Sequence, residues 1–325
     1  AVGRQAGKEE TGAYGWTHVG NHAGTNQKIG GGLANNSSFG YQAGNKNVTG
    51  TNNTMIGKAA GYYNTAGGNT AVGVNAFYGG SGRDFASENT ALGQSALSEG
   101  VIGSVGRSVA VGTYAGRHAT GSYNTFMGYK AGNGGITSAP YSSGTSNVAV
   151  GYQALTGFTT GNKNTVLGYQ AGDAVTTGNY NVLLGSDAGG GITTGGNNVV
   201  IGHQALDASS TAADGMVAIG VEALSTFNGG NVDSSVAVGE YSLNSLTDGV
   251  SSVAVGTKAL RYTTGDRNTA VGSDAAYNMT SGDDNVAVGY LALGIAGNAS
   301  DNVAVGNKAG RLAVKTQGSV FIGME

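Results

Sequence analysis

The chain has 325 residues, of which 62 are Gly, with one Pro, no Cys, 11% charged residues and a formal net charge of −3. Gly is far above its usual share of about 7%, but it does not recur at every third position, which excludes a collagen triple helix. The low charge and the lack of a Lys/Arg block argue against nucleic-acid binding, and no apolar run is long enough for a membrane-spanning helix. Because 39% of the residues are hydrophobic and recur in register, disorder is also excluded.

A Gly that follows a short apolar run recurs along the whole chain, and we call it the anchor glycine. Successive anchors are 16 to 23 residues apart, with 17 the commonest spacing, and residues 147–202 are the most regular part. The anchors are Gly3, Gly20, Gly40, Gly57, Gly73, Gly93, Gly112, Gly128, Gly151, Gly168, Gly185, Gly202, Gly220, Gly239, Gly256, Gly272, Gly289, Gly306 and Gly323. A fixed period of this length is typical of a solenoid protein.

The three residues before each anchor predict a short β-strand. Val or Thr comes first, a small residue (most often Ala) second, and a large apolar residue third, as in Val148, Ala149 and Val150. This is a period-2 pattern of β-branched residues. We expect the first and third positions to face the core and the small residue to face the other way, toward another tightly packed surface. A charge at Leu167 should then unfold the coil.

Two variable residues follow the anchors, then Ala at 17 of 18 places, with Ser242 the exception. The next residue is Gly or Leu, as in Leu155, except at Phe77 and Ala276. We interpret this segment as a second short strand or an extended segment flanked by turns. Thr, Gly, Asn and Asp fill the remainder of each repeat, and these residue types are typical of turns.

The repeat length selects the architecture. No stretch between glycines is long enough for a typical helix, and a propeller blade needs about 40 residues. We therefore predict an all-β fold: a parallel β-roll or β-solenoid of about 19 short coils, mostly of 17 residues, with two short strands per coil. Residues 1–325 form one continuous repeat array. Because both ends fall inside a motif (AVGRQAG and SVFIGME), we interpret the array as a fragment of a longer chain.

The consensus N-[VT]-A-[VI]-G-x-x-A resembles the head repeats of trimeric autotransporter adhesins. The Ser variants are the most similar, for example Ser108-Val109-Ala110-Val111-Gly112. The segment NVAVGYQAL is also similar to repeats in phage tail fibres and bacterial surface proteins. The resemblance implies a left-handed β-roll, a homotrimer, and display outside a cell or on a virion. Ala replaces the family's Ser after the anchor, and the family's membrane anchor, stalk and C-terminal chaperone domain have no counterpart in these residues.

Candidate site residues fall into three groups. The first is structural turn glycines: Gly57, Gly73, Gly112, Gly151, Gly168, Gly185, Gly202, Gly256 and Gly289. The second is an Asn column before the strands, which we interpret as a stacked hydrogen-bond ladder rather than a ligand site. The third is possible ligand contacts, either Tyr-Gln pairs that could stack on sugar rings or residues of the long insertion 133–144. These are Tyr152, Gln153, Tyr169, Gln170, Pro140 and Tyr141.

Enzyme activity is not expected, and we predict no cofactor and no metal site. The pair Glu222 and Glu240 is the only candidate for glycosidase carboxylates, and such residues more often lie solvated on a solenoid face. His18 and His22 flank Gly20 near Trp16, but two His residues lack the third ligand of a typical zinc centre.

The leading functional hypothesis is an extracellular structural and adhesive fibre, a trimer that attaches to a host glycan or surface receptor. The alternative is a purely structural, self-assembling filament subunit. A glycan-degrading tailspike and an ice-binding solenoid are weaker alternatives. The ice-binding hypothesis is disfavoured because the recurring Thr residues are assigned to the core.

Overall fold

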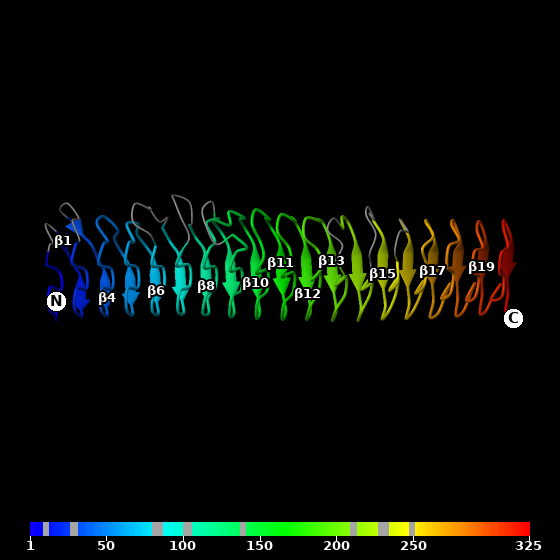
Figure 1. Ribbon diagram of the computed structural model, residues 1–325, viewed down its shortest axis with the longest axis horizontal. Helices are drawn as coiled ribbons and strands as arrows, with labels where there is room; N and C mark the ends of the chain where they lie inside the picture. The colour runs from blue at the N-terminus through cyan, green and yellow to red at the C-terminus, as the bar shows by residue number, and fades with distance from the viewer. Residues whose placement is uncertain are drawn as a thin grey trace. The chain divides into compact units, whose positions relative to one another are not determined.

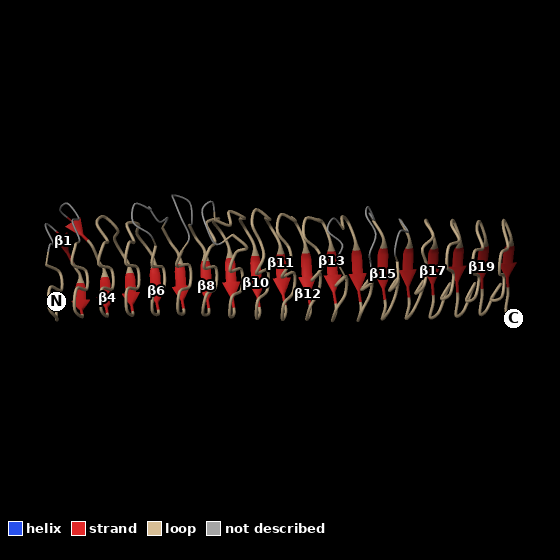
Figure 2. Cartoon of the chain, in the orientation of Figure 1, coloured by secondary structure: helices blue, strands red, loops and turns tan. Residues whose placement is uncertain are grey.

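One three-residue strand per repeat builds the structure, which is a computed structural model. It describes residues 1–8, 13–26, 32–79, 87–99, 106–136, 141–208, 213–226, 234–246 and 251–325. The chain forms two units, unit 1 (Ala1–Lys163) and unit 2 (Asn164–Glu325), and within each the strands lie side by side in chain order (Figure 1). The described residues contain strands and loops but no helix (Figure 2). Accordingly, no helix in that part of the chain could cross a membrane.

Unit 1 contains a parallel sheet that follows the anchor glycines. Its strands are β2 (Thr17–Val19), β4 (Ser37–Phe39), β5 (Thr54–Ile56), β6 (Thr70–Val72), β7 (Thr90–Leu92), β8 (Val109–Val111), β9 (Thr125–Met127) and β10 (Val148–Val150). A separate pair joins β1 (Ala13–Tyr14) to β3 (Gly32–Leu33). The long insertion between β9 and β10 leaves the register intact, since Val148 still pairs with Thr125.

Unit 2 repeats the same arrangement. Its strands are β11 (Thr165–Leu167), β12 (Val182–Leu184), β13 (Val199–Ile201), β14 (Val217–Ile219), β15 (Val236–Val238), β16 (Val253–Val255), β17 (Thr269–Val271), β18 (Val286–Val288), β19 (Val303–Val305) and β20 (Val320–Ile322). All pair in parallel with like positions opposite, for example Val182 with Val199. The prediction of an all-β parallel solenoid with coils of about 17 residues is confirmed.

The second strand per coil, predicted after the anchor, is absent from the described residues. The backbone there turns through left-handed conformations, with φ of 55° at Gln153 and 52° at Leu155. The turns of successive coils still hydrogen-bond to one another, as in Asp187 N to Tyr169 O at 2.9 Å. A left-handed residue costs about 1–2 kcal/mol, and burial of Leu155 offsets a comparable amount.

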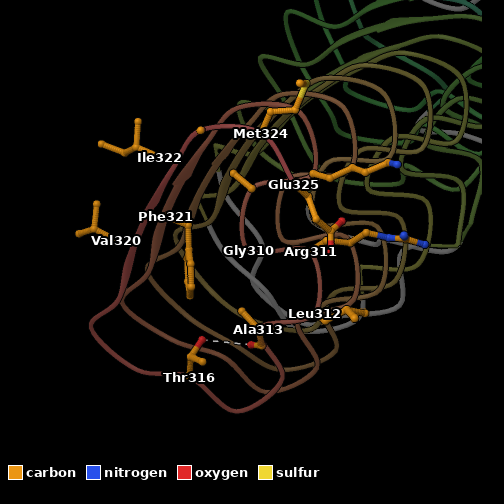
Figure 3. Close-up of a pocket in the computed structure, with 13 residues that line it drawn as sticks. Gly310, Arg311, Leu312, Ala313, Thr316, Val320, Phe321, Ile322, Met324 and Glu325 are labelled. Carbon is orange, nitrogen blue, oxygen red and sulfur yellow. Dashed lines mark hydrogen bonds between the residues drawn. The ribbon is translucent and has the colours of Figure 1, made fainter.

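The strand alternation is real, but the sequence prediction assigned its two faces wrongly. The middle residue points into the coil, so that Val166 is fully buried. The flanking residues point outward, and Leu167, which was predicted to lie in the core, is 50% exposed. Figure 3 shows the same alternation in β20, where Phe321 points into the coil while Val320 and Ile322 point away. The small residues are therefore core residues, because the interior of a single coil is narrow.

Two positions of each coil share the space of the core: the middle strand residue and the Gly or Leu four residues after the anchor. Where one of these side chains is large, the other is small. Where the middle residue is Ala149, the later position is the fully buried Leu155. Where it is Phe126, the position is Gly132, whose missing Cβ would meet the Phe126 ring at 2.1 Å. A large side chain at one position thus requires a small one at the other.

The anchor glycines let successive coils approach closely. Each has a φ between 127° and 152°, as at Gly57 and Gly168. A Cβ on Gly185 would lie 2.4 Å from the carbonyl oxygen of Gly202, the next anchor. Because these neighbours are backbone atoms, they cannot move aside for a side chain.

The Asn column before the strands is buried and forms a ladder, in agreement with its structural interpretation. In unit 2, the Asn181 backbone N–H donates to Asn164 Oδ1 at 3.0 Å, and Asn198 N–H donates to Asn181 Oδ1 at 3.2 Å. Asn181 Nδ2 also donates to the Gly195 carbonyl oxygen at 3.0 Å. Each side chain thereby satisfies polar groups of two coils, as buried polar groups require.

Candidate functional site

The outward residues of the strands form an apolar face on each unit, which we call the apolar sheet face. In each unit it consists of the first and third residues of every three-residue strand. Its most exposed large members include Phe39, Ile56, Leu92, Met127, Val148, Leu167, Val255, Val271, Val303, Val305, Val320 and Ile322. No charged residue occurs at any of these strand positions. Such a continuous uncharged surface is unusual for the outside of a soluble protein.

The size of this face can be estimated for unit 2. Ten strands spaced about 4.8 Å apart, each about 10 Å long, give a projected area of about 480 Å². Apolar patches above a few hundred Å² mark interaction sites on soluble proteins. In unit 1 the first strand position is mostly Thr or Ser, as in Thr54 and Thr70. The face of unit 1 therefore presents hydroxyl groups beside apolar side chains and is less apolar than that of unit 2.

A second feature is a polar groove on the turns of unit 1, with a volume of about 410 Å³. Its wall contains the charged side chains of Lys58, Glu99 and Arg117 and the aromatic ring of Tyr78. Gln42, Ala59, Asn75, Ser95 and Ser98 complete the lining. We call this cavity the turn groove. Of these residues only Gln42 belongs to the Tyr-Gln pairs that the sequence singled out, and the others were not predicted as contacts, although short side chains after three successive anchors were a readable signal.

Aromatic rings stack beside the turn groove. The rings of Tyr62 and Tyr78 lie 5.4 Å apart at 24°, and Tyr63 meets Tyr78 edge-on at 5.7 Å. Burial, reinforced by the neighbouring tyrosines, raises the pKa of the Tyr62 hydroxyl, and burial likewise raises that of Tyr78. Both hydroxyls therefore remain neutral hydrogen-bonding groups at physiological pH.

The charged wall of the groove is an ordered network. Arg117 Nε donates to Glu99 Oε1 at 2.9 Å, and His118 Nε2 lies 3.1 Å from Glu99 Oε2. The Arg117 guanidinium also lies over the Tyr114 ring, 5.2 Å from its centre. Burial, the largest cause, lowers the pKa of His118, so the imidazole is mainly neutral and the network retains one cation and one anion.

The sequence-predicted tyrosines of unit 1 stack on neighbouring aromatic rings. Tyr152 stacks on Tyr129 with ring centres 5.4 Å apart, and Tyr141 stacks on His118 at 6.1 Å. Tyr152 and Gln153 lie in unit 1, Tyr169 and Gln170 lie in unit 2, and Pro140 lies outside the described residues. None of them lines the turn groove.

A larger cavity, of about 550 Å³, lies at the open side of the last coil (Figure 3). Its lining includes Ala309, Ala313 and Phe321, which occupy positions that are core positions in earlier coils. It is thus part of the solenoid interior rather than a separate ligand site. Within the described ranges, no cluster of three or more His, Cys, Asp or Glu side chains could hold a metal ion.

His18 takes a core position in β2 and gives unit 1 a pH-dependent stability. Its ring is fully buried and stacks on Trp16 with centres 5.1 Å apart. Burial lowers the pKa of His18 from 6.5 to about 4. Since the unfolded chain binds a proton more readily, the stabilisation is complete above pH 6.5 and is lost as the pH falls toward 4. The expected loss is about 3 kcal/mol.

Hydrogen exchange of the Gly40 amide, which donates to the Val19 carbonyl oxygen, measures this local effect. Exchange protection should fall between pH 6.5 and 4 after correction for the intrinsic rate. His18→Met is the matched control, because Met55 occupies the same core position in β5, and it should remove most of the fall. Any pH dependence that comes from His118 is the same in the wild type and in His18→Met, so it cancels in the comparison. An undiminished fall in His18→Met would show that His18 is not the responsible group.

Comparison with known proteins assigns no family. The sequence matches no protein-family model, and no curated protein is significantly similar to it.

Proposed function

We propose that the chain is a structural and adhesive fibre that assembles as a homotrimer through the apolar sheet face. The supporting observation is the exposure of this uncharged face on both units. Leaving it in water forgoes about 25 cal/mol for each Å² of apolar surface that a partner could cover. The fibre is proposed to lie outside the cell, on a cell or virion surface, and to mediate attachment.

A second copy of the same chain is the occupant that fits this face best. The outward side chains form ridges that repeat with the strand spacing of about 4.8 Å. Another copy presents ridges with the same period, so the two surfaces can interdigitate along their whole length. A globular partner would match only a few ridges. The proposed number of three copies comes from the resemblance to trimeric autotransporter adhesin heads. The structure supports only the choice of the apolar sheet face as the surface of contact.

Sedimentation equilibrium tests the proposal. The wild-type chain is expected to have about three times its single-chain mass of 32.0 kDa. The double variant Ile56→Glu/Leu167→Glu places one charge on the face of each unit and is expected to sediment as a monomer. Tyr180→Glu changes a loop residue of similar exposure (55%) and is expected to remain trimeric. A monomeric wild-type chain would overturn the proposal, and filaments in electron micrographs would favour the filament alternative.

The structure changes the argument about ice binding. The Thr positions, assigned to the core from the sequence, lie on the outward face, so that reason for disfavouring ice binding no longer holds. The neighbouring column, however, mixes Phe39, Val72 and Met127, whose unequal lengths give an uneven surface. A lattice plane of ice requires equal heights. We therefore expect no thermal hysteresis from the trimer or from the monomeric double variant.

A further inference from the structure

We infer that the turn groove of unit 1 binds an acidic saccharide, a short chain of sugars that carries carboxylates. This inference rests on the adhesive part of the proposed function and names the class of ligand that the fibre would recognise. The groove differs from the apolar sheet face in polarity, in charge and in the backbone elements that form it. It is polar, charged, and built from turns rather than strands.

The groove exists because three successive turns carry short side chains between longer ones. The second residue after the anchor is Ala59, Asn75 and Ser95 in consecutive coils, whereas it is Gln42 before them and Tyr114 after them. The backbone does not change over this stretch, since the turns remain hydrogen-bonded. Asn75 N, for example, donates to Lys58 O at 2.9 Å. The hollow is therefore a fixed feature of the solenoid surface.

Several polar side chains of the groove are available to a ligand. Gln42, Lys58 and Asn75 make no side-chain hydrogen bond or ion pair within the described part of the chain, and all three line the cavity. Two amides supply donors and acceptors for sugar hydroxyls, and both are held on a hydrogen-bonded backbone. An amide pair with an adjacent aromatic ring matches the alternating polar edge and apolar face of a pyranose.

The charges select an acidic sugar over a neutral one. Arg117 is neutralised by Glu99, whereas Lys58 has no carboxylate partner among the residues that the structure describes, so the described lining of the groove has a net positive charge. A carboxylate near Lys58 would gain a charge-assisted hydrogen bond, which is about twice as strong as a neutral one. Tyr78, held by its stack on Tyr62, offers a ring against which a sugar can pack.

The test is isothermal titration calorimetry of the full chain with two trisaccharides of equal length, a trigalacturonate and a neutral maltotriose. The wild type is expected to bind trigalacturonate at least tenfold more tightly, with an affinity that falls with added salt. Lys58→Gln should abolish this preference. Tyr78→Phe should retain binding, and Tyr78→Ser should lose it. Lys258→Gln, in a turn of unit 2 outside the groove, should leave both affinities unchanged.

Three results would overturn the inference: equal affinity for the two sugars, insensitivity to Lys58→Gln, or competition by inorganic sulfate as effective as by the sugar. Circular dichroism melts of each variant establish that the fold is kept, and Lys58 is an exposed residue whose change should not disturb it. The sedimentation result is independent. A trimer that binds no saccharide overturns only the saccharide site, and a monomer that binds it overturns only the proposed assembly.

Discussion

Replacing Gly202 with Ala is expected to disrupt the stack in unit 2 and to cost more than about 3 kcal/mol. Two effects add at this anchor. Its φ of +142° is one that L-residues rarely adopt, and a Cβ would lie 2.2 Å from the carbonyl oxygen of Gly220. The nearest atoms to this Cβ are backbone atoms of Gly220, which cannot move aside as a flexible side chain could, so no local adjustment relieves the clash.

Gly318→Ala is the matched control, because Gly318 also has a positive φ (63°) but has no atom within 4 Å of the Cβ position. It should cost only about 1 kcal/mol, the penalty of the conformation alone. Hydrogen exchange of the Gly220 amide, which donates to the Ile201 carbonyl oxygen, reports on the coil directly. Equal loss of protection in the two variants would mean that the close approach of the anchors contributes nothing.

Val166→Asp is expected to destabilise the fold strongly and Leu167→Asp only slightly, although the two residues are adjacent. Asp at the fully buried position 166 places an unpaired charge in an apolar interior, which should cost more than about 4 kcal/mol and unfold the local coils. Asp at position 167, half exposed, should change the free energy of unfolding of the monomer by less than about 1 kcal/mol. Under the proposed function it should weaken assembly instead.

Denaturant unfolding at low protein concentration separates the two variants, because it measures the fold without the contribution of assembly. Circular dichroism should show a cooperative strand signal for Leu167→Asp and a diminished one for Val166→Asp. If Leu167→Asp were the more destabilised protein, the original assignment of Leu167 to the core would be right and the face described here would be interior.

The repeat, the strand positions and the parallel stack followed from the sequence because identical residues recur at a fixed spacing. Period-2 alternation, however, does not say which face is inside. Large β-branched residues such as Val148 looked like core residues, while the coil is so narrow that Ala149 fills it together with Leu155. The pairing of a small middle residue with a later Leu, or of Phe126 with Gly132, was the signal that would have resolved the two faces.

The turns after the anchors were harder to predict. Residues such as Gln153 and Leu155 have no intrinsic preference for a left-handed backbone, and they adopt it because stacked neighbours and burial enforce it. The turn groove was missed for a related reason. Its lining comes from five coils, so Lys58 and Arg117 are far apart in the chain and meet only once the coils are stacked.

Thiol labelling tests the central claim, that the third strand residue faces outward and is covered by other copies. The chain has no Cys, so Val166→Cys and Leu167→Cys each introduce a single reporter. In dilute, monomeric samples Leu167→Cys should react rapidly with a maleimide and Val166→Cys should be protected. At concentrations where the chain assembles, Leu167→Cys should become protected as well. Faster labelling of Val166→Cys, or labelling of Leu167→Cys at the same rate in the assembled protein, would contradict the account.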